Sequence, residues 1–269
     1  MSNRRLAIAG LALVAALGLT GCGPDEDKAA TTGGGKGTGV AAQQAADKQD
    51  PAADLAAAAQ KLGEQSMKID MNMAGAMSMS GVADPKSGNV KMSMEMGALG
   101  DGTAIEMRKL GDDLYMKFGG SIGSMLGGGD KTKPWMHIDA SKLSEGSSFN
   151  VMPKDDPAGT KAMISAMTQV ERVGDTGFKG TLDLTKSPRY NKNKSLEALG
   201  AKATKVPFTA KKDGEGRLTE LTLDMSSLGA GAGKVETKYY DFGTPVLVEA
   251  PPASQVQEAP SQLSGILNA

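Results

Sequence analysis

The sequence predicts an α+β domain in which a large antiparallel β-sheet has one apolar face covered by a few helices. Apolar and polar residues alternate with a period of two through much of residues 67–243, which is typical of half-buried strands. Turn segments such as KDGEG at 212–216 join consecutive stretches, which favours hairpins. Short helical segments between the strands supply the cover that an apolar sheet face needs.

Three helices are predicted. Asp50 is a good N-cap and Pro51 suits the first helical position, so a helix is expected over residues 51–62. The pair Asp-Pro at 156–157 repeats this start signal. The second helix would carry three apolar residues at helical spacing, which are Met163, Ile164 and Met167. A shorter third helix is predicted over residues 195–199.

The strand pattern is clearest near the start of the domain. Residues 67–81 alternate without interruption, which predicts one long strand with a single apolar face. A turn is expected at 83–89, and a second alternating strand at 90–96. Later strands are predicted around 105–107, 114–118, 178–184, 206–210, 217–225 and 234–243.

Residues 67–97 hold eight of the 17 methionines of the chain. Thioethers are soft ligands, so copper is one interpretation, but His137 is the only histidine available to complete such a site. Ordinary core packing is a second interpretation. The third, which we favour, is an apolar ligand cavity, because a tightly packed core uses methionine sparingly. Its predicted lining is Met71, Met73, Met77, Met79, Met92, Met94, Met96, Ile105, Met107, Leu114, Met116, Met163 and Met167.

The N-terminus predicts export. Arg4 and Arg5 precede an apolar run over residues 6–19, as in a secretory signal peptide. The following LTGC, which ends at Cys22, resembles a bacterial lipobox. That resemblance implies a signal peptide over 1–21, cleavage before Cys22 and acylation of this cysteine, the only one in the chain.

The rest of the chain divides by composition. Residues 22–49 are rich in Gly, Ala, Thr and charge, so we expect a flexible tether there. The folded domain is predicted over 50–252, and residues 253–269 are expected to form a weakly ordered tail.

Composition and motifs favour no catalytic or nucleic-acid function. The formal net charge is −1, so no global field attracts nucleic acid. Residues 119–123 fit G-x-S-x-G, but a glycine-rich stretch does not hold the helix that this motif requires after the serine. His137 is expected at the surface, on the same side of its strand as Trp135. We predict no enzyme activity, no catalytic residues, no metal site and no cofactor.

Several segments together resemble the actinobacterial LppX/LprG-type lipoproteins, which share the fold of the lipoprotein carrier LolA. The most specific are KKDGEGRLTEL at 211–221 and YDFGTPVLVEAPP at 240–252. Others are DLYMKF at 113–118, PWMHID at 134–139 and VGDTGFKGTLDL at 173–184. The resemblance implies a strongly curved antiparallel half-barrel wrapped over helices, with an apolar cavity between them. It also implies binding of acylated lipids and their movement outward from the membrane.

These observations predict a monomeric lipoprotein on the outer face of the cytoplasmic membrane. It would bind acylated lipids or lipoglycans in an apolar cavity and carry them outward, with a membrane transporter as a candidate partner. The alternative is a non-catalytic structural or sensory partner of a membrane protein, and copper binding is a minor alternative.

A basic segment supplies a candidate membrane contact. It carries Lys186, Arg189, Lys192 and Lys194 in a chain that is otherwise nearly neutral. The alternative is a solvated loop. Each such charge near an anionic surface contributes about 1 kcal/mol of binding. We therefore predict that reversing three of these charges weakens binding of the unacylated domain to anionic liposomes. Unchanged binding in a sedimentation assay would favour the solvated loop.

Overall fold

A computed structural model describes residues 50–97, 103–120, 123, 132–143, 160–186, 199–229 and 233–260. These residues belong to one compact unit, Asp47–Ala269. The predicted signal peptide at 1–21, Cys22, the tether at 22–49, the serine of the G-x-S-x-G motif and most of the helix predicted at 195–199 lie outside the described residues.

The described residues form twelve strands, two α-helices and several short 3₁₀ turns. The strands are β1 (Met67–Met73), β2 (Met77–Asp84), β3 (Asn89–Glu95), β4 (Ala104–Leu110), β5 (Asp113–Phe118), β6 (Trp135–Asp139), β7 (Met167–Val173), β8 (Gly177–Leu182), β9 (Val206–Lys212), β10 (Leu218–Asp224), β11 (Lys234–Tyr240) and β12 (Val256–Glu258). The α-helices are α1 (Pro51–Gln60) and α3 (Thr160–Ala166). The 3₁₀ turns are η1 (Lys61–Gly63), η3 (Ala140–Lys142), η4 (Leu184–Lys186), η5 (Gly200–Lys202), η6 (Ser226–Leu228) and η7 (Ala253–Gln255).

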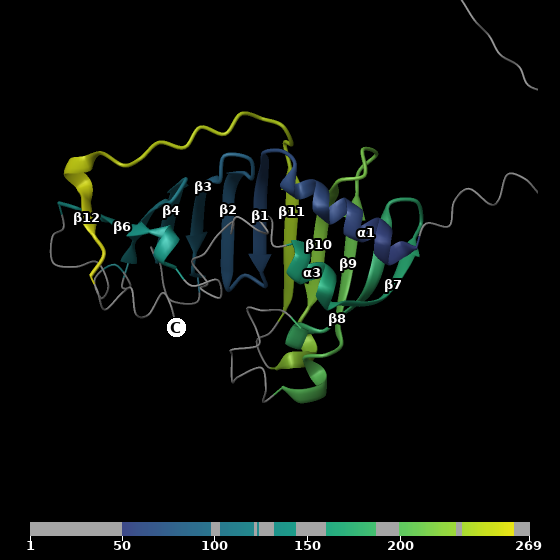
Figure 1. Cartoon of the computed structure of the whole chain (residues 1–269). Coiled ribbons are helices and arrows are strands. Elements are labelled where there is room, and N and C mark those ends of the chain that lie inside the picture. Colours follow the sequence, from purple (N-terminus) through teal and green to yellow (C-terminus); the bar gives the residue numbers. More distant parts are fainter. Residues whose placement is uncertain are drawn as a thin grey trace, which may run out of the picture. The chain divides into compact units, whose positions relative to one another are not determined.

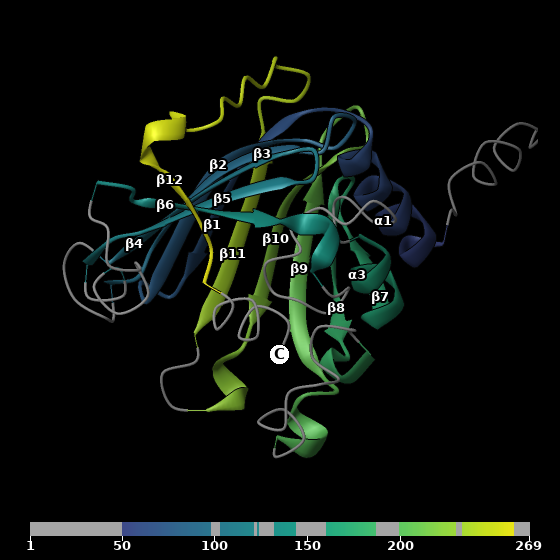
Figure 2. The ribbon, with the colours of Figure 1, turned by 60° about the vertical axis from the view of Figure 1, so that its left-hand side comes forward.

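All twelve strands belong to a single sheet with the order β12-β6-β5-β4-β3-β2-β1-β11-β10-β9-β8-β7. Figures 1 and 2 together label these strands, and Figure 2 shows that the sheet is curved. Every neighbouring pair is antiparallel except β12 with β6, which is parallel. The predicted α+β class, with a curved and mainly antiparallel sheet and a few helices, is therefore confirmed.

The strand register gathers the apolar residues on one face, which we call the inner face. Directly paired residues share a face of a sheet. One row of such pairs crosses nine strands in the order Phe178, Ala210, Leu221, Thr237, Met71, Met79, Met94, Ile105 and Phe118. The opposite, outer face of the same strands carries polar residues such as Asp70, Ser80 and Ser93.

The single long strand predicted over 67–81 is wrong. The chain instead forms a hairpin, with β1 and β2 joined by residues 74–76. Ala74 and Gly75 have φ values of 47° and 74°, and the Ala76 N–H donates to the Met73 carbonyl oxygen at 2.8 Å. The loop has three residues, so Met73 pairs with Met77 and alternation continues through the turn unchanged.

Two apolar clusters form the core, both on the inner face. The helix-covered core packs Leu55 and Leu62 from the α1–η1 segment against strands β8–β10, including Phe178 and Phe208. The second core lies at β4–β6 and contains Met107, Leu114, Met116, Met136 and Ile138. In Figure 1, α1 and α3 lie over the β7–β11 half of the sheet.

Two other predicted elements are confirmed, and the predicted end of the second helix is wrong. The KDGEG turn is confirmed, because it joins β9 to β10. The first helix begins at Pro51, and the Ala52 N–H donates to Asp50 Oδ1 at 3.0 Å, as an N-cap requires. Met167, predicted to lie on the second helix, is instead the first residue of β7, because the helical turn of α3 ends at Ala166.

The predicted tail also needs correction. Ala253–Gln255 form η7, and Val256–Glu258 form β12, which pairs with β6 in the sheet. Residues 244–255, which we call the strap, connect β11 to β12 and run past the ends of the intervening strands in Figure 1. The folded unit therefore extends beyond the boundary predicted at residue 252.

A buried carboxylate attaches α1 to the sheet. Asp54 accepts hydrogen bonds from Lys212 Nζ at 2.7 Å to each carboxylate oxygen, and Arg172 Nη2 lies 2.8 Å from Asp54 Oδ2. Burial alone would raise the pKa of Asp54, but the hydrogen bonds and charges of Lys212 and Arg172 outweigh it and lower the pKa. Both cations also lie over the Phe178 ring.

We predict that Asp54→Asn lowers the free energy of unfolding by about 3 kcal/mol at pH 7, because it leaves two partly buried cations without their counterion. Since the pKa of Asp54 is lowered in the folded state, the difference from wild type shrinks as pH falls below about 4. Denaturant unfolding at several pH values measures both effects. The exposed Asp175 is the matched control, and Asp175→Asn should change stability by no more than about 0.5 kcal/mol. Equal effects of the two substitutions would contradict the anchoring role of Asp54.

Candidate functional site

Five methionines on the inner face form the candidate site, and we call them the methionine face. They are Met71 and Met73 on β1, Met77 and Met79 on β2, and Met94 on β3. All five are partly exposed. Among the described residues, they pack against neither core cluster, so they form an apolar strip between the two.

The register brings these side chains together across three strands. Met71 pairs with Met79, Met73 pairs with Met77, and Met79 pairs with Met94. Directly paired residues have Cβ atoms about 4.5–5.5 Å apart. The row continues through Ile105 to Phe118, and five strands at a spacing of about 4.8 Å give it a length of about 19 Å. The result is a continuous apolar strip.

The other predicted cavity residues take different places. Met107, Leu114 and Met116 are buried in the second core, and Met92 and Ile105 pack against that core. Met163 and Met167 pack against the helix-covered core. Met96 follows β3, where its N–H donates to the Thr103 carbonyl oxygen at 2.9 Å. The structure thus separates methionines that fill a core from methionines that are partly exposed on the inner face.

Two hollows lie on the outer face of the sheet, opposite the methionine face. One of about 440 Å³ lies between the strap and strands β2–β4, and its lining includes Ser80, Lys91 and Arg108. The other, of about 370 Å³, is lined in large part by polar residues such as Asp70, Asn72 and Ser78. Apolar residues also line both hollows, among them Val82, Val246 and Leu247 in the first and Met71 and Met79 in the second. Because both hollows lie on the outer face, neither is the apolar cavity predicted between the sheet and the helices.

The structure describes only part of the predicted basic segment and of the G-x-S-x-G motif. Lys186 ends η4, and its Nζ lies 3.9 Å from Asp183 Oδ2. Arg189, Lys192 and Lys194 lie outside the described residues. Within the described part of the chain, no helix has the length and apolar character needed to cross a membrane.

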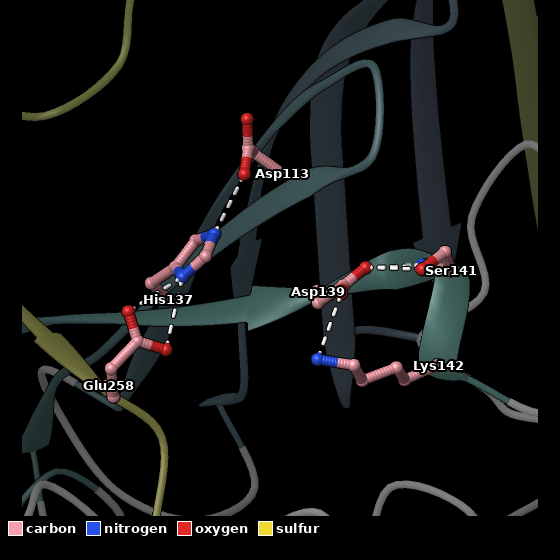
Figure 3. A network of polar contacts seen from close by, with 6 residues as sticks. All are labelled: Asp113, His137, Asp139, Ser141, Lys142 and Glu258. Carbon is pink, nitrogen blue, oxygen red and sulfur yellow. Dashed lines mark hydrogen bonds and ion pairs between the residues drawn. The ribbon is translucent and has the colours of Figure 1, made fainter.

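In the described part of the chain, methionine sulfur atoms would have to supply the ligands of a copper site. Among those residues, no group of three or more His, Cys, Asp or Glu side chains is arranged to hold a metal ion. The sole histidine, His137, is on β6, and its ring nitrogens contact carboxylates on opposite sides of the ring (Figure 3).

His137 closes a polar clamp on the outer face, which sequence reasoning missed. Its Nδ1 lies 2.9 Å from Glu258 Oε1 on β12, and its Nε2 lies 2.8 Å from Asp113 Oδ1 on β5 (Figure 3). The Tyr115 ring lies beside it, with ring centroids 5.2 Å apart. Burial alone would lower the pKa of His137, but the hydrogen bonds to Asp113 and Glu258 and the charges of both carboxylates outweigh it and raise the pKa.

The clamp attaches the strap at its far end. The Ala259 N–H donates to the His137 carbonyl oxygen at 3.0 Å, so main chain and side chain both join β12 to β6. Nearby, Arg108 donates to the Glu249 carbonyl oxygen at 3.1 Å and stacks over Trp135. Trp135, predicted to face outward with His137, is therefore buried.

Asp139, also drawn in Figure 3, accepts hydrogen bonds from Ser141 and Lys142 that lower its pKa to about 2.

Comparison with known proteins does not assign a family. No family model matches the chain, and no curated protein matches it. Among solved structures, a chain of the Pseudomonas aeruginosa MucA/MucB complex is similar, with 12% sequence identity and a TM-score of 0.30. The similarity covers 76% of this chain and 59% of that chain, less than two thirds of its length. At this TM-score the likeness supports no conclusion about function.

We predict that the His137 clamp stabilises the protein only while the imidazole is charged. Because the pKa of His137 is raised in the folded state, the contribution is complete below about pH 6.5 and is lost as pH rises through the folded-state pKa. Glu258→Gln should therefore lower the free energy of unfolding by about 1 kcal/mol at pH 5.5 and have little effect at pH 9.

Nuclear magnetic resonance titration supplies the direct measurement, because the chain has a single histidine. Its pKa should lie above 6.5 in the wild type and fall in Glu258→Gln. Glu249 lies on the strap, where its carbonyl oxygen accepts a hydrogen bond from Arg108. Glu249→Gln should therefore leave the titration unchanged. The same pKa in all three proteins would rule out the clamp.

Proposed function

We propose that this chain is a membrane-anchored lipoprotein that binds acylated lipids on its methionine face and carries them outward from the cytoplasmic membrane without catalysis. The observation that carries the proposal is the strip of five partly exposed methionines between two packed cores. Contiguous exposed apolar surface is uncommon on monomeric proteins and marks sites for ligands or partners.

The chemistry of the strip suits flexible acyl chains. Methionine is unbranched and polarizable, so it adapts to ligands of variable shape. The row from Met71 to Phe118 is about 19 Å long, which is comparable to an extended long acyl chain. Each buried CH₂ group contributes about 0.8 kcal/mol, so ten such groups supply about 8 kcal/mol against the entropic cost of association.

The half-barrel architecture, the position of the acyl chain and the membrane anchor are parts of the same proposal. The curved sheet and the helices over its inner face are consistent with the half-barrel implied by the resemblance to LppX/LprG-type lipoproteins. In that arrangement the acyl chain would lie between sheet and cover, with its polar headgroup at the rim. Cys22 would hold the domain at the membrane, and residues 22–49 would give it reach.

A protein partner is the alternative occupant of the methionine face. A structural or sensory lipoprotein would bury the same strip against a membrane protein. Native mass spectrometry after mild extraction separates the two possibilities. Acyl lipids that stay with the domain support the carrier, whereas a lipid-free domain in a complex with a membrane protein supports the alternative.

We predict that Met94→Gln weakens binding of a fluorescent acyl probe about tenfold, because it places an amide in the apolar row. The partly exposed position of Met94 should keep the fold intact, which circular dichroism verifies. Ser93→Gln is the matched control, because Ser93 is the neighbouring residue on the outer face, and it should leave binding unchanged. Equal weakening by both substitutions, or by neither, would place the acyl chain elsewhere.

A further inference from the structure

The sheet holds two classes of methionine that differ in access to solvent. The five residues of the methionine face are partly exposed. Met67, Met116 and Met136 are only 3%, 1% and 1% exposed. Both classes occupy regular strands of the same sheet, so they differ chiefly in solvent access. A reagent in solution should therefore distinguish them.

Thioether sulfur is the oxidisable sulfur of this domain. The chain has one cysteine, Cys22, which precedes the folded unit. A hydroperoxide oxidises methionine in one step: a sulfur lone pair attacks the distal peroxide oxygen and the O–O bond breaks. The sulfur becomes a sulfoxide, having lost two electrons. The peroxide is reduced to water or the corresponding alcohol after its remaining oxygen takes a proton. Sulfoxide reductases reverse the change.

Oxidation would alter the strip in a specific way. A sulfoxide converts a flexible apolar side chain into a polar one. Met79 pairs directly with both Met71 and Met94, so one sulfoxide there lies about 5 Å from two neighbouring side chains. Since the five residues pack against neither core within the described part of the chain, their oxidation should change the surface without unfolding the sheet.

We propose that the methionine face is a reversible oxidation site, at which sulfoxide formation by hydroperoxides releases an apolar ligand. The release step rests on the proposed function, whereas the site itself does not. The site is defined by Met71, Met73, Met77, Met79 and Met94.

The site is tested without any ligand. The folded domain is treated with hydrogen peroxide, quenched at intervals, digested and analysed by mass spectrometry for sulfoxide at each methionine. The five face residues should oxidise about tenfold faster than Met67, Met116 and Met136, which react only through transient opening of the sheet. The same treatment in denaturant should remove the difference. Equal rates in the folded protein would overturn the proposal.

Release is tested with the same fluorescent acyl probe before and after oxidation. Oxidised protein should bind the probe about tenfold more weakly, and methionine sulfoxide reductase should restore binding. The variant with Leu at all five positions retains apolarity without sulfur, so it should bind the probe and be insensitive to peroxide. If the methionine face is oxidised but the affinity for the probe does not change, the proposed release is wrong, whereas the oxidation site stands. A wild-type protein that never binds the probe would instead contradict the proposed function.

Discussion

The fold depends on one constraint, the register of an antiparallel ladder that keeps every apolar row on the same face of the sheet. Nine neighbouring strands, from β8 to β5, each contribute one residue to the row that passes through Met71 and Met79. A shift of one residue at any pair would turn the following apolar residues to the outer face. Two cores and the strip between them are thus parts of a single continuous surface.

A few polar contacts hold the two ends of the sheet in place. Asp54 holds α1 against β7 and β9 through Arg172 and Lys212, which places the helical cover over one end of the sheet. At the other end, His137 holds β12 through Glu258. The two contacts respond oppositely to pH, because one depends on an ionised carboxylate and the other on a charged imidazole. The methionine face lies between these two regions.

Methionine gives that strip two properties at once. Its flexible thioether suits acyl chains of variable shape, and the same sulfur can be oxidised and repaired. Leucine would supply the first property and not the second. A carrier with this surface would couple affinity for an apolar ligand to the redox state of its surroundings, with the buried Met116 and Met136 protected by packing.

Local periodicity and turn chemistry were enough to predict the alternating strands, the helix start at Asp50 and Pro51, the KDGEG turn, and the methionine content of the inner face. The hairpin loop at residues 74–76 was not predicted, because a three-residue loop preserves the period of two. Which methionines are buried and which are partly exposed became clear from the packing of the folded chain, as did the contact of His137 with Glu258, 121 residues away. Such contacts depend on which strands become neighbours, and local sequence does not encode this.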